Sequence, residues 1–163
     1  MNHPTSSAEA PVWGHETTSE AWQESELCHR QMLRAIPVAV YSCDAEGRVT
    51  FFNRAAARLW GREPELNKDL WCGSWKIFAP DGTPIPVDQC PMARTIREGR
   101  SIHGEEIIVE RQDGTRRRVL PYPEPILNSA GAIVGAVNTL VDITGIQNGH
   151  SNPELHPAEA RLH

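Results

Sequence analysis

The chain has 163 residues, enough for one domain of ordinary size. Hydrophobic residues make up 39% and charged residues 23%, as in a globular protein, and the net charge of -5 disfavours a nucleic-acid-binding surface. No apolar run approaches the ~18 residues that a membrane-spanning helix needs, and residues 1–20 lack the basic start and apolar stretch of a secretory signal. We therefore expect a cytoplasmic protein that binds neither membrane nor nucleic acid.

The chain has four cysteines and no Cys-x-x-Cys spacing: Cys28, Cys43, Cys72 and Cys90. Metal sites need clustered ligands, which this spacing does not provide. Cytoplasmic thiols stay reduced, and buried ones behave as small hydrophobic side chains. We therefore expect reduced structural cysteines and no metal site.

Residues 1–18 are rich in Ser, Thr, Glu and Pro, a composition typical of disordered segments. Ser19 is a suitable N-cap for a helix over residues 19–35, which carries a rough apolar stripe. Pro37 ends that helix because proline lacks an amide donor and disfavours a helical residue before it. At the other end, residues 147–163 are expected to form a disordered tail.

Two short β-rich runs follow, at residues 38–43 and 48–52, joined by an acidic turn that contains glycine. Asn53 is a good N-cap for a short helix over residues 54–60. Gly61 suits the left-handed position that ends such a helix.

The stretch over residues 62–89 is irregular and predicts a rigid loop with a small hairpin around an Asp-Gly pair. Asp88 is the candidate N-cap of a helix over residues 91–98, which begins with proline and is followed by Gly99.

The last third of the sequence predicts three strands. Residues 106–111 and 115–122 flank an Asp-Gly turn, which is a strong hairpin signal. Three prolines are expected to end the second of these strands: Pro121, Pro123 and Pro125. After another turn, residues 132–143 form the longest strand.

This order of elements predicts an α+β fold over residues 36–146, with an antiparallel sheet of about five strands and short helices on one face. Both faces of the final strand are mostly apolar, so both need cover. We expect the short helices to cover one face, and the helix at residues 19–35 or a second subunit to cover the other.

Several short motifs appear in a fixed order: Ile36-Pro37-Val38-Ala39-Val40, Asp44-Ala45-Glu46-Gly47-Arg48-Val49, Phe52-Asn53-Arg54-Ala55-Ala56, Asp113-Gly114-Thr115, Pro125-Ile126, Gly131-Ala132-Ile133-Val134-Gly135 and Asp142-Ile143-Thr144. In this order and spacing they resemble a PAS domain, the small sensory module of bacterial signalling proteins. Another stretch resembles an insertion found in one subset of that family: Asp88-Gln89-Cys90-Pro91-Met92-Ala93.

The resemblance implies a five-stranded sheet with helices that form a cup over it. Members of the family sense small molecules, redox state, light or oxygen, or simply dimerise. Their output commonly leaves through an Asp-Ile-Thr motif at the end of the last strand. Here the signal-output residues would be Asp142, Ile143 and Thr144.

The same resemblance implies that the strand face carrying Asn138 and Leu140 lines the cup. A buried Asn needs hydrogen-bond partners, which a ligand, a backbone carbonyl or a water can supply. Trp71 and Trp75 would share a face if this segment were helical, either in the core or as a pocket wall. The complete set of pocket candidates is Tyr41, Trp71, Trp75, Met92, Ile96, Asn138 and Leu140.

Neither haem nor flavin is expected as a cofactor. In haem-binding relatives a histidine from the region of His103 holds the iron, and a neutral imidazole is a proper axial ligand. His103, however, follows Gly99 near a strand start, which departs from the helical position of those relatives and indicates a solvated loop histidine. Flavin-binding relatives carry a reactive cysteine in an Asn-Cys-Arg helix, which the sequence around Cys72 does not match.

The stretch from the predicted helix over residues 91–98 to the following hairpin is locally basic: Arg94, Arg97, Arg100, Arg111, Arg116, Arg117 and Arg118. It is either a solvated hairpin paired with Glu105, Glu106 and Glu110, or a patch that binds an anion or a partner.

Catalytic motifs such as a Gly-x-Ser-x-Gly elbow, a phosphate loop or His-Glu-x-x-His do not occur, so we expect no enzyme. The predicted function is sensory signal transduction: the domain binds a small molecule or a protein partner and signals through its last strand. Its partner would be a second copy, or an effector in trans such as the histidine kinase of a two-component system. The alternatives are a haem-based or other cofactor-based redox or oxygen sensor, and a pure dimerisation module.

Overall fold

The computed structural model describes residues 16–146, which fall into two separate units. The first unit contributes one helix, α1 (Glu16–Ala35), which begins three residues before the predicted Ser19 cap, so the disorder expected up to residue 18 is wrong for its last three residues. Residues 1–15 and the tail expected at 147–163 lie outside the described residues. Large apolar side chains of α1 are exposed: Trp22, Leu27 and Met32.

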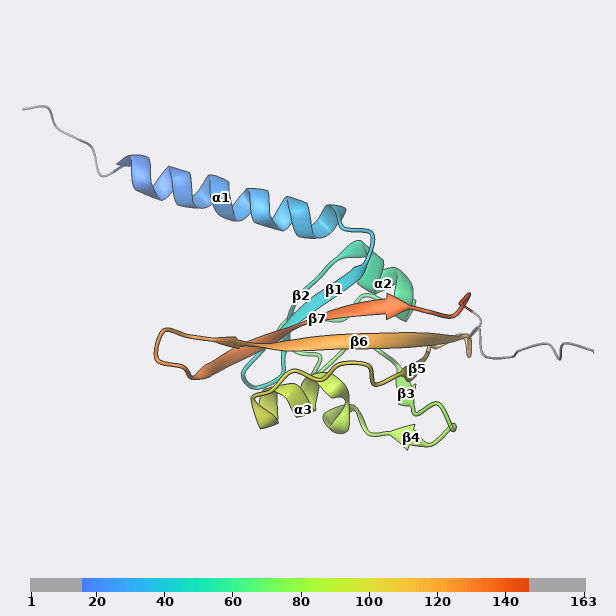
Figure 1. Ribbon diagram of the computed structural model, residues 1–163. Coiled ribbons are helices and arrows are strands. Elements are labelled where there is room, and N and C mark those ends of the chain that lie inside the picture. Colours follow the sequence, from blue (N-terminus) through green and yellow to red (C-terminus); the bar gives the residue numbers. More distant parts are fainter. Residues whose placement is uncertain (1–15, 147–163) are drawn as a thin grey trace, which may run out of the picture. The chain divides into compact units, whose positions relative to one another are not determined.

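The second unit is built on one antiparallel sheet of seven strands in the order β2-β1-β7-β6-β5-β3-β4 (Figure 1). The strands are β1 (Ala39–Asp44), β2 (Val49–Phe52), β3 (Lys76–Phe78), β4 (Pro84–Ile85), β5 (Ile107–Glu110), β6 (Arg116–Leu127) and β7 (Ile133–Asp142). The α+β class and the antiparallel sheet are confirmed. The count of about five strands is low because two very short strands, β3 and β4, form in the stretch that was predicted to be a loop with a hairpin.

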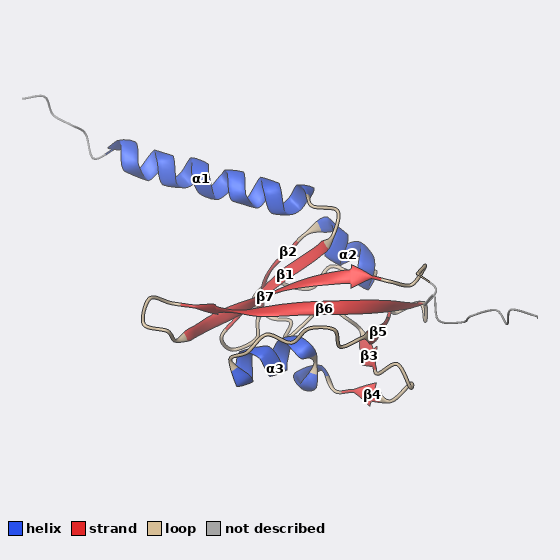
Figure 2. Ribbon diagram, in the orientation of Figure 1, coloured by secondary structure: helices blue, strands red, loops and turns tan. Residues whose placement is uncertain are grey.

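Three short helical segments complete the unit: α2 (Arg54–Trp60), the 3-10 turn η1 (Val87–Gln89) and α3 (Pro91–Glu98) (Figure 2). Asn53 caps α2 as predicted, because its side-chain oxygen accepts a hydrogen bond from the amide of Ala56. The predicted cap of α3 is wrong: Asp88 lies inside η1, and Cys90 occupies the N-cap position without a side-chain hydrogen bond.

The prolines of β6 do not end the strand, which runs through all three of them to Leu127. Ile143 donates its amide to the carbonyl of Arg118 on the β7 side, whereas Ile102 donates to the carbonyl of Pro123 on the opposite side. Backbone groups alternate along a strand, so the odd-numbered prolines all face away from β7. Their missing amide donors therefore remove no hydrogen bond to β7, and the strand tolerates them.

The core lies between one face of the sheet and the two α-helices of this unit. Ala136, Asn138 and Leu140 of β7 are buried on that face, together with Trp60 of α2 and Met92 of α3. Side chains on the opposite face of β7, such as Val137 and Val141, are half-buried. The helices thus cover one face, as predicted.

Candidate functional site

Asn138 and Tyr41 form the centre of a buried hydrogen-bond chain that links β7 to the loop before β3. The Asn138 side chain accepts from the amide of Tyr122 at 3.0 Å and donates to the Tyr41 hydroxyl at 3.2 Å. Tyr41 in turn donates to the backbone carbonyl of Trp71 at 3.0 Å. Burial raises the pKa of Tyr41 well above its usual value, so its hydroxyl stays neutral and can donate. Protein groups therefore satisfy Asn138 without a ligand.

The core of the cup is almost filled by its own side chains. Tyr41 packs edge-on against Trp60, with ring centroids 5.0 Å apart. The remaining cavity has about 10 Å³ of free volume and is bordered by four of the pocket candidates: Tyr41, Met92, Asn138 and Leu140. Such a volume holds about one water molecule. Ile96 is buried in the same core but does not border the cavity.

The two tryptophans do not share a face, because their segment is a loop and not a helix. Trp71 has a positive φ of 70°, donates its amide to the carbonyl of Gly47 and lays its ring over that glycine. Trp75 is 50% exposed and lines a shallow surface hollow beside Phe78. Neither side chain borders the core cavity.

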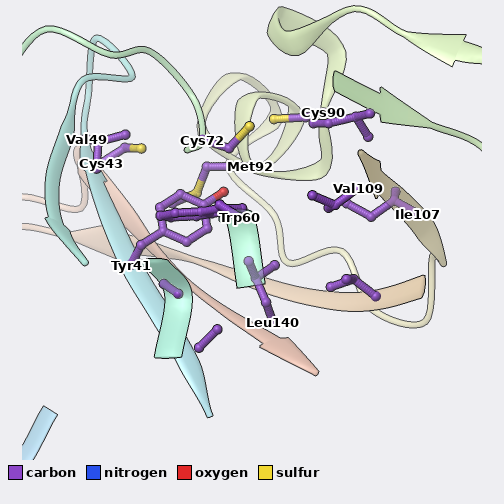
Figure 3. Packing of buried hydrophobic residues seen from close by; sticks show 14 of the residues in the cluster. Tyr41, Cys43, Val49, Trp60, Cys72, Cys90, Met92, Ile107, Val109 and Leu140 are labelled. Carbon is purple, nitrogen blue, oxygen red and sulfur yellow. The ribbon is translucent and has the colours of Figure 1, made fainter. Parts of the chain in front are cut away.

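Three buried thiols surround Tyr41, which the sequence did not reveal because they are far apart in the chain: Cys43, Cys72 and Cys90. The sulfur atoms of Cys72 and Cys90 point toward each other (Figure 3), and this proximity shifts the pKa of Cys72 down and that of Cys90 up. Cys43 contacts the carbonyl of Trp71 at 3.7 Å instead, and burial raises the pKa of its thiol. Within residues 16–146, no group of three His, Cys, Asp or Glu side chains could hold a metal ion.

Neither the position of His103 nor the size of the core cavity fits a haem or a flavin. His103 is exposed, and its Nε2 contacts the carboxylate of Glu124 on the surface. It does not border the core cavity, so it is not placed to hold a haem there. A cavity of about 10 Å³ also has no room for a flavin ring.

A hollow of about 450 Å³ opens between α2 and the ends of β1, β6 and β7, and we call it the rim hollow. Its lining includes the apolar residues Leu59 and Leu140, and it also includes Arg58, Arg111 and Arg117 with the single carboxylate of Asp142. Arg111 donates to the carbonyls of Arg58 and Leu59, at the C-terminal end of α2. The positive charges outnumber the carboxylate, so the rim hollow favours an anion.

The Asp-Ile-Thr segment lies at the edge of the rim hollow. Asp142 accepts the amide of Thr144 at 2.9 Å with one carboxylate oxygen and lies 3.7 Å from Arg117 with the other. The Thr144 hydroxyl accepts the amide of Arg118 at 3.0 Å, and the Ile143 amide donates to the carbonyl of Arg118. The three predicted output residues therefore hold the end of β7 against β6.

Solved structures resemble this chain in fold. An RNA-binding light-oxygen-voltage receptor aligns with a TM-score of 0.57 and 19% identity, over 88% of this chain and 37% of the receptor, so the chain spans about a third of that protein. The PAS domain of an HTR-like protein from Haloarcula marismortui aligns with a TM-score of 0.57 and 14% identity, over 79% of this chain and 100% of that domain. The PAS domain of the fruit-fly ELK potassium channel aligns with a TM-score of 0.56 and 14% identity, over 74% of this chain and 97% of that domain. At such identities the likeness shows the fold alone.

No curated protein matches the sequence. The family model of the PAS domain, by contrast, matches residues 37–145, which is most of the chain and nearly all of the described residues of the second unit. The motifs, the antiparallel sheet with helices on one face, and this match agree, and the chain belongs to the PAS domain family of sensory signalling modules.

Proposed function

We propose that this chain is a cytoplasmic signal-transduction module, not an enzyme, and that β7 carries its signal from the core to the Asp142–Thr144 segment. The observation that supports this is the hydrogen-bond chain from the Trp71 carbonyl through Tyr41 to Asn138, in the middle of β7. A change in the core that moves Tyr41 shifts the balance between two arrangements of β7, and any contact that prefers one arrangement reads the shift.

Hydrogen exchange at the end of β7 tests this coupling. Tyr41→Phe keeps the ring but removes both hydrogen bonds of the hydroxyl, so we expect faster exchange at residues 138–144. Ser42→Ala is the matched control, because Ser42 bonds Thr50 on the other face of the same strand. Equal exchange at residues 138–144 in both variants would contradict the proposal.

The partner that we propose is a second copy of the chain, or an effector in trans such as a histidine kinase of a two-component system. Each unit presents apolar side chains that nothing within that unit covers: Trp22 and Leu27 on α1, and Val134, Ile126 and Leu127 near the β6–β7 turn. Exposed apolar groups of this kind favour association. Light scattering during size-exclusion chromatography should show a dimer, and a monomer at every concentration would rule out the second copy.

The ligand class that the rim hollow favours is a small organic anion. Its volume of about 450 Å³ lies in the usual range for small-molecule sites. Citrate, at ionic strength matched with potassium chloride, should raise the melting temperature of the protein. Arg58→Gln with Arg117→Gln should abolish that rise, whereas Arg116→Gln, whose side chain pairs with Glu110, should not. A rise that persists in the double variant would place the anion elsewhere.

A pure dimerisation module is the second candidate, and the filled core favours it. Native mass spectrometry and an absorption spectrum of freshly purified protein separate the two. A dimer with no bound metabolite, no visible absorption and no response to citrate supports dimerisation alone. A Soret band would instead indicate haem.

A further inference from the structure

Cys72 and Cys90 come from different segments and meet in the core. Cys72 lies in the loop between α2 and β3, and Cys90 is the residue before α3. Both are nearly inaccessible, with 6% and 2% of their surface exposed. Their sulfur atoms face each other (Figure 3), and both thiols border the cavity that has room for about one water-sized molecule.

The surroundings of Cys72 stabilise a thiolate. Hydrogen bonds from the Cys90 thiol and from the Ser74 hydroxyl and amide, with the positive charge of Arg62, lower the pKa of Cys72 in spite of its burial. The same hydrogen bond to Cys72, together with burial, raises the pKa of Cys90, which keeps the proton. A thiol with a lowered pKa beside a thiol that keeps its proton is the usual arrangement of a redox-active cysteine pair.

We propose that Cys72 and Cys90 are a redox-active dithiol that a small hydroperoxide converts into a disulfide. The Cys72 thiolate attacks one oxygen of hydrogen peroxide, the O–O bond breaks, and the leaving hydroxide takes a proton from solvent to become water. Cys72 is now a sulfenic acid. The Cys90 sulfur then attacks the Cys72 sulfur, and the sulfenic oxygen leaves as water with the Cys90 proton. Two thiols are oxidised to one disulfide while one hydroperoxide is reduced.

The disulfide would form next to the hydrogen-bond chain that reaches β7. Cys72 directly follows Trp71, whose carbonyl accepts the Tyr41 hydroxyl, and Tyr41 bonds Asn138. A covalent link from Cys72 to the start of α3 therefore acts on the loop that holds Tyr41. The role of the dithiol as a sensory input rests on the proposed function. The oxidation of Cys72 and Cys90 to a disulfide does not depend on that function.

Peptide mapping after oxidation tests the dithiol. The full chain with Cys28→Ser, which removes the exposed thiol of α1, is treated under native conditions with a small excess of hydrogen peroxide, then alkylated and digested. We expect a mass loss of two hydrogens, a cross-linked peptide containing Cys72 and Cys90, and a Cys43 that is still alkylated. No cross-linked peptide, or one that involves Cys43 instead, would overturn the proposal without needing any variant in the core.

Two variants assign the roles. In Cys90→Ser, Cys72 should stop at the sulfenic acid, which dimedone traps. In Cys72→Ser, neither a disulfide nor a dimedone adduct on Cys90 should form. Equal dimedone labelling in the two variants would remove the assignment of Cys72 as the nucleophile. The mapping reads the thiols directly and needs no partner, so its failure would leave the proposed role of β7 intact.

Discussion

Asn138 is a buried polar residue whose side chain joins neighbouring strands through hydrogen bonds. It is 2% exposed and has a protein partner on each side, the Tyr122 amide and the Tyr41 hydroxyl. A polar group left unpaired in a core costs ~1–3 kcal/mol. The residue therefore ties β1, β6 and β7 together at one point.

Asn138→Ala should lower the free energy of unfolding by ~2 kcal/mol, because it removes the buried side-chain hydrogen bonds to the Tyr122 amide and the Tyr41 hydroxyl. Tyr41→Phe should cost ~1 kcal/mol. The two changes share a hydrogen bond, so the double variant should lose less than the sum, by ~0.5 kcal/mol or more. Urea unfolding of the four proteins measures this coupling. Strict additivity would mean that the bond between the two side chains contributes nothing.

Gly47 is required for two separate reasons. Its φ of +85° belongs to the left-handed region, and a Cβ there would meet the Trp71 ring at 2.3 Å. Gly114 has nearly the same φ, +83°, but a Cβ at that position would have no atom within 4 Å, so Gly114 is a matched control.

Gly114→Ala should cost ~1 kcal/mol through backbone conformation alone. Gly47→Ala should cost clearly more, ~3 kcal/mol, since the added methyl group also displaces the Trp71 ring. Thermal or urea unfolding of both variants gives the comparison. Similar losses of stability in the two variants would show that the close packing of Gly47 against Trp71 does not contribute to the free energy of unfolding.

At the scale of elements, whether β6 tolerates a proline depends on which edge of the strand the backbone amide at that position faces. Tyr122→Pro should destabilise the fold by ~3 kcal/mol more than Tyr122→Ala, because it removes the amide that bonds Asn138. Pro125→Ala should change stability by less than ~1 kcal/mol, since its nitrogen faces away from β7. Circular dichroism during urea unfolding provides the measurement, and the reverse order would refute the assigned orientation of β6.

Local sequence signals predicted the elements well where a single residue decides the backbone. Asn53 as a cap, and Gly61 and Gly99 as helix ends, are confirmed by the side-chain hydrogen bond of Asn53 and the positive φ of both glycines. The continuation of β6 past Pro121 could not be predicted, because it depends on which neighbour each edge of the strand faces. That information comes from the sheet and not from the strand.

The candidate site was predicted only in part for the same reason. Alternation along β7 placed Asn138 and Leu140 on one face, and the structure buries both of them. The spacing of Trp71 and Trp75 suggested a shared helical face, but the positive φ of Trp71 turns the chain there. The contact between Cys72 and Cys90 depends on how the loop before β3 and the start of α3 pack together, which no local pattern encodes.

At the scale of the whole molecule, several carboxyl groups have a pKa below their usual range. Two hydrogen bonds from Arg118 lower the pKa of Glu106. Hydrogen bonds from Ser101 and His103 lower that of Glu124, and hydrogen bonds from Thr115 lower that of Asp113. Such groups bind fewer protons in the folded chain than in the unfolded chain, so they stabilise the fold above their unfolded pKa values.

Stability should therefore stay level from neutral pH down to about pH 4.5 and fall below it, as these carboxylates take up protons with unperturbed values near ~4. Glu106→Gln should make this fall shallower, whereas Glu63→Gln, at an exposed carboxylate without an ion pair among the described residues, should not. Urea midpoints at neutral pH and in mild acid test the sign. A midpoint that rises on acidification would contradict it.

The three prolines of β6 also bear on how copies of this protein can meet. β5 pairs with β6 only as far as Val119. Beyond it, the edge of β6 that faces away from β7 carries carbonyl acceptors but no amide donors at Pro121, Pro123 and Pro125. Another strand would find no amide donor at these three positions, and the Pro123 carbonyl already accepts the amide of Ile102, so this edge disfavours the addition of strands. Any association of two copies along this edge would then depend on side-chain contacts rather than on a shared sheet.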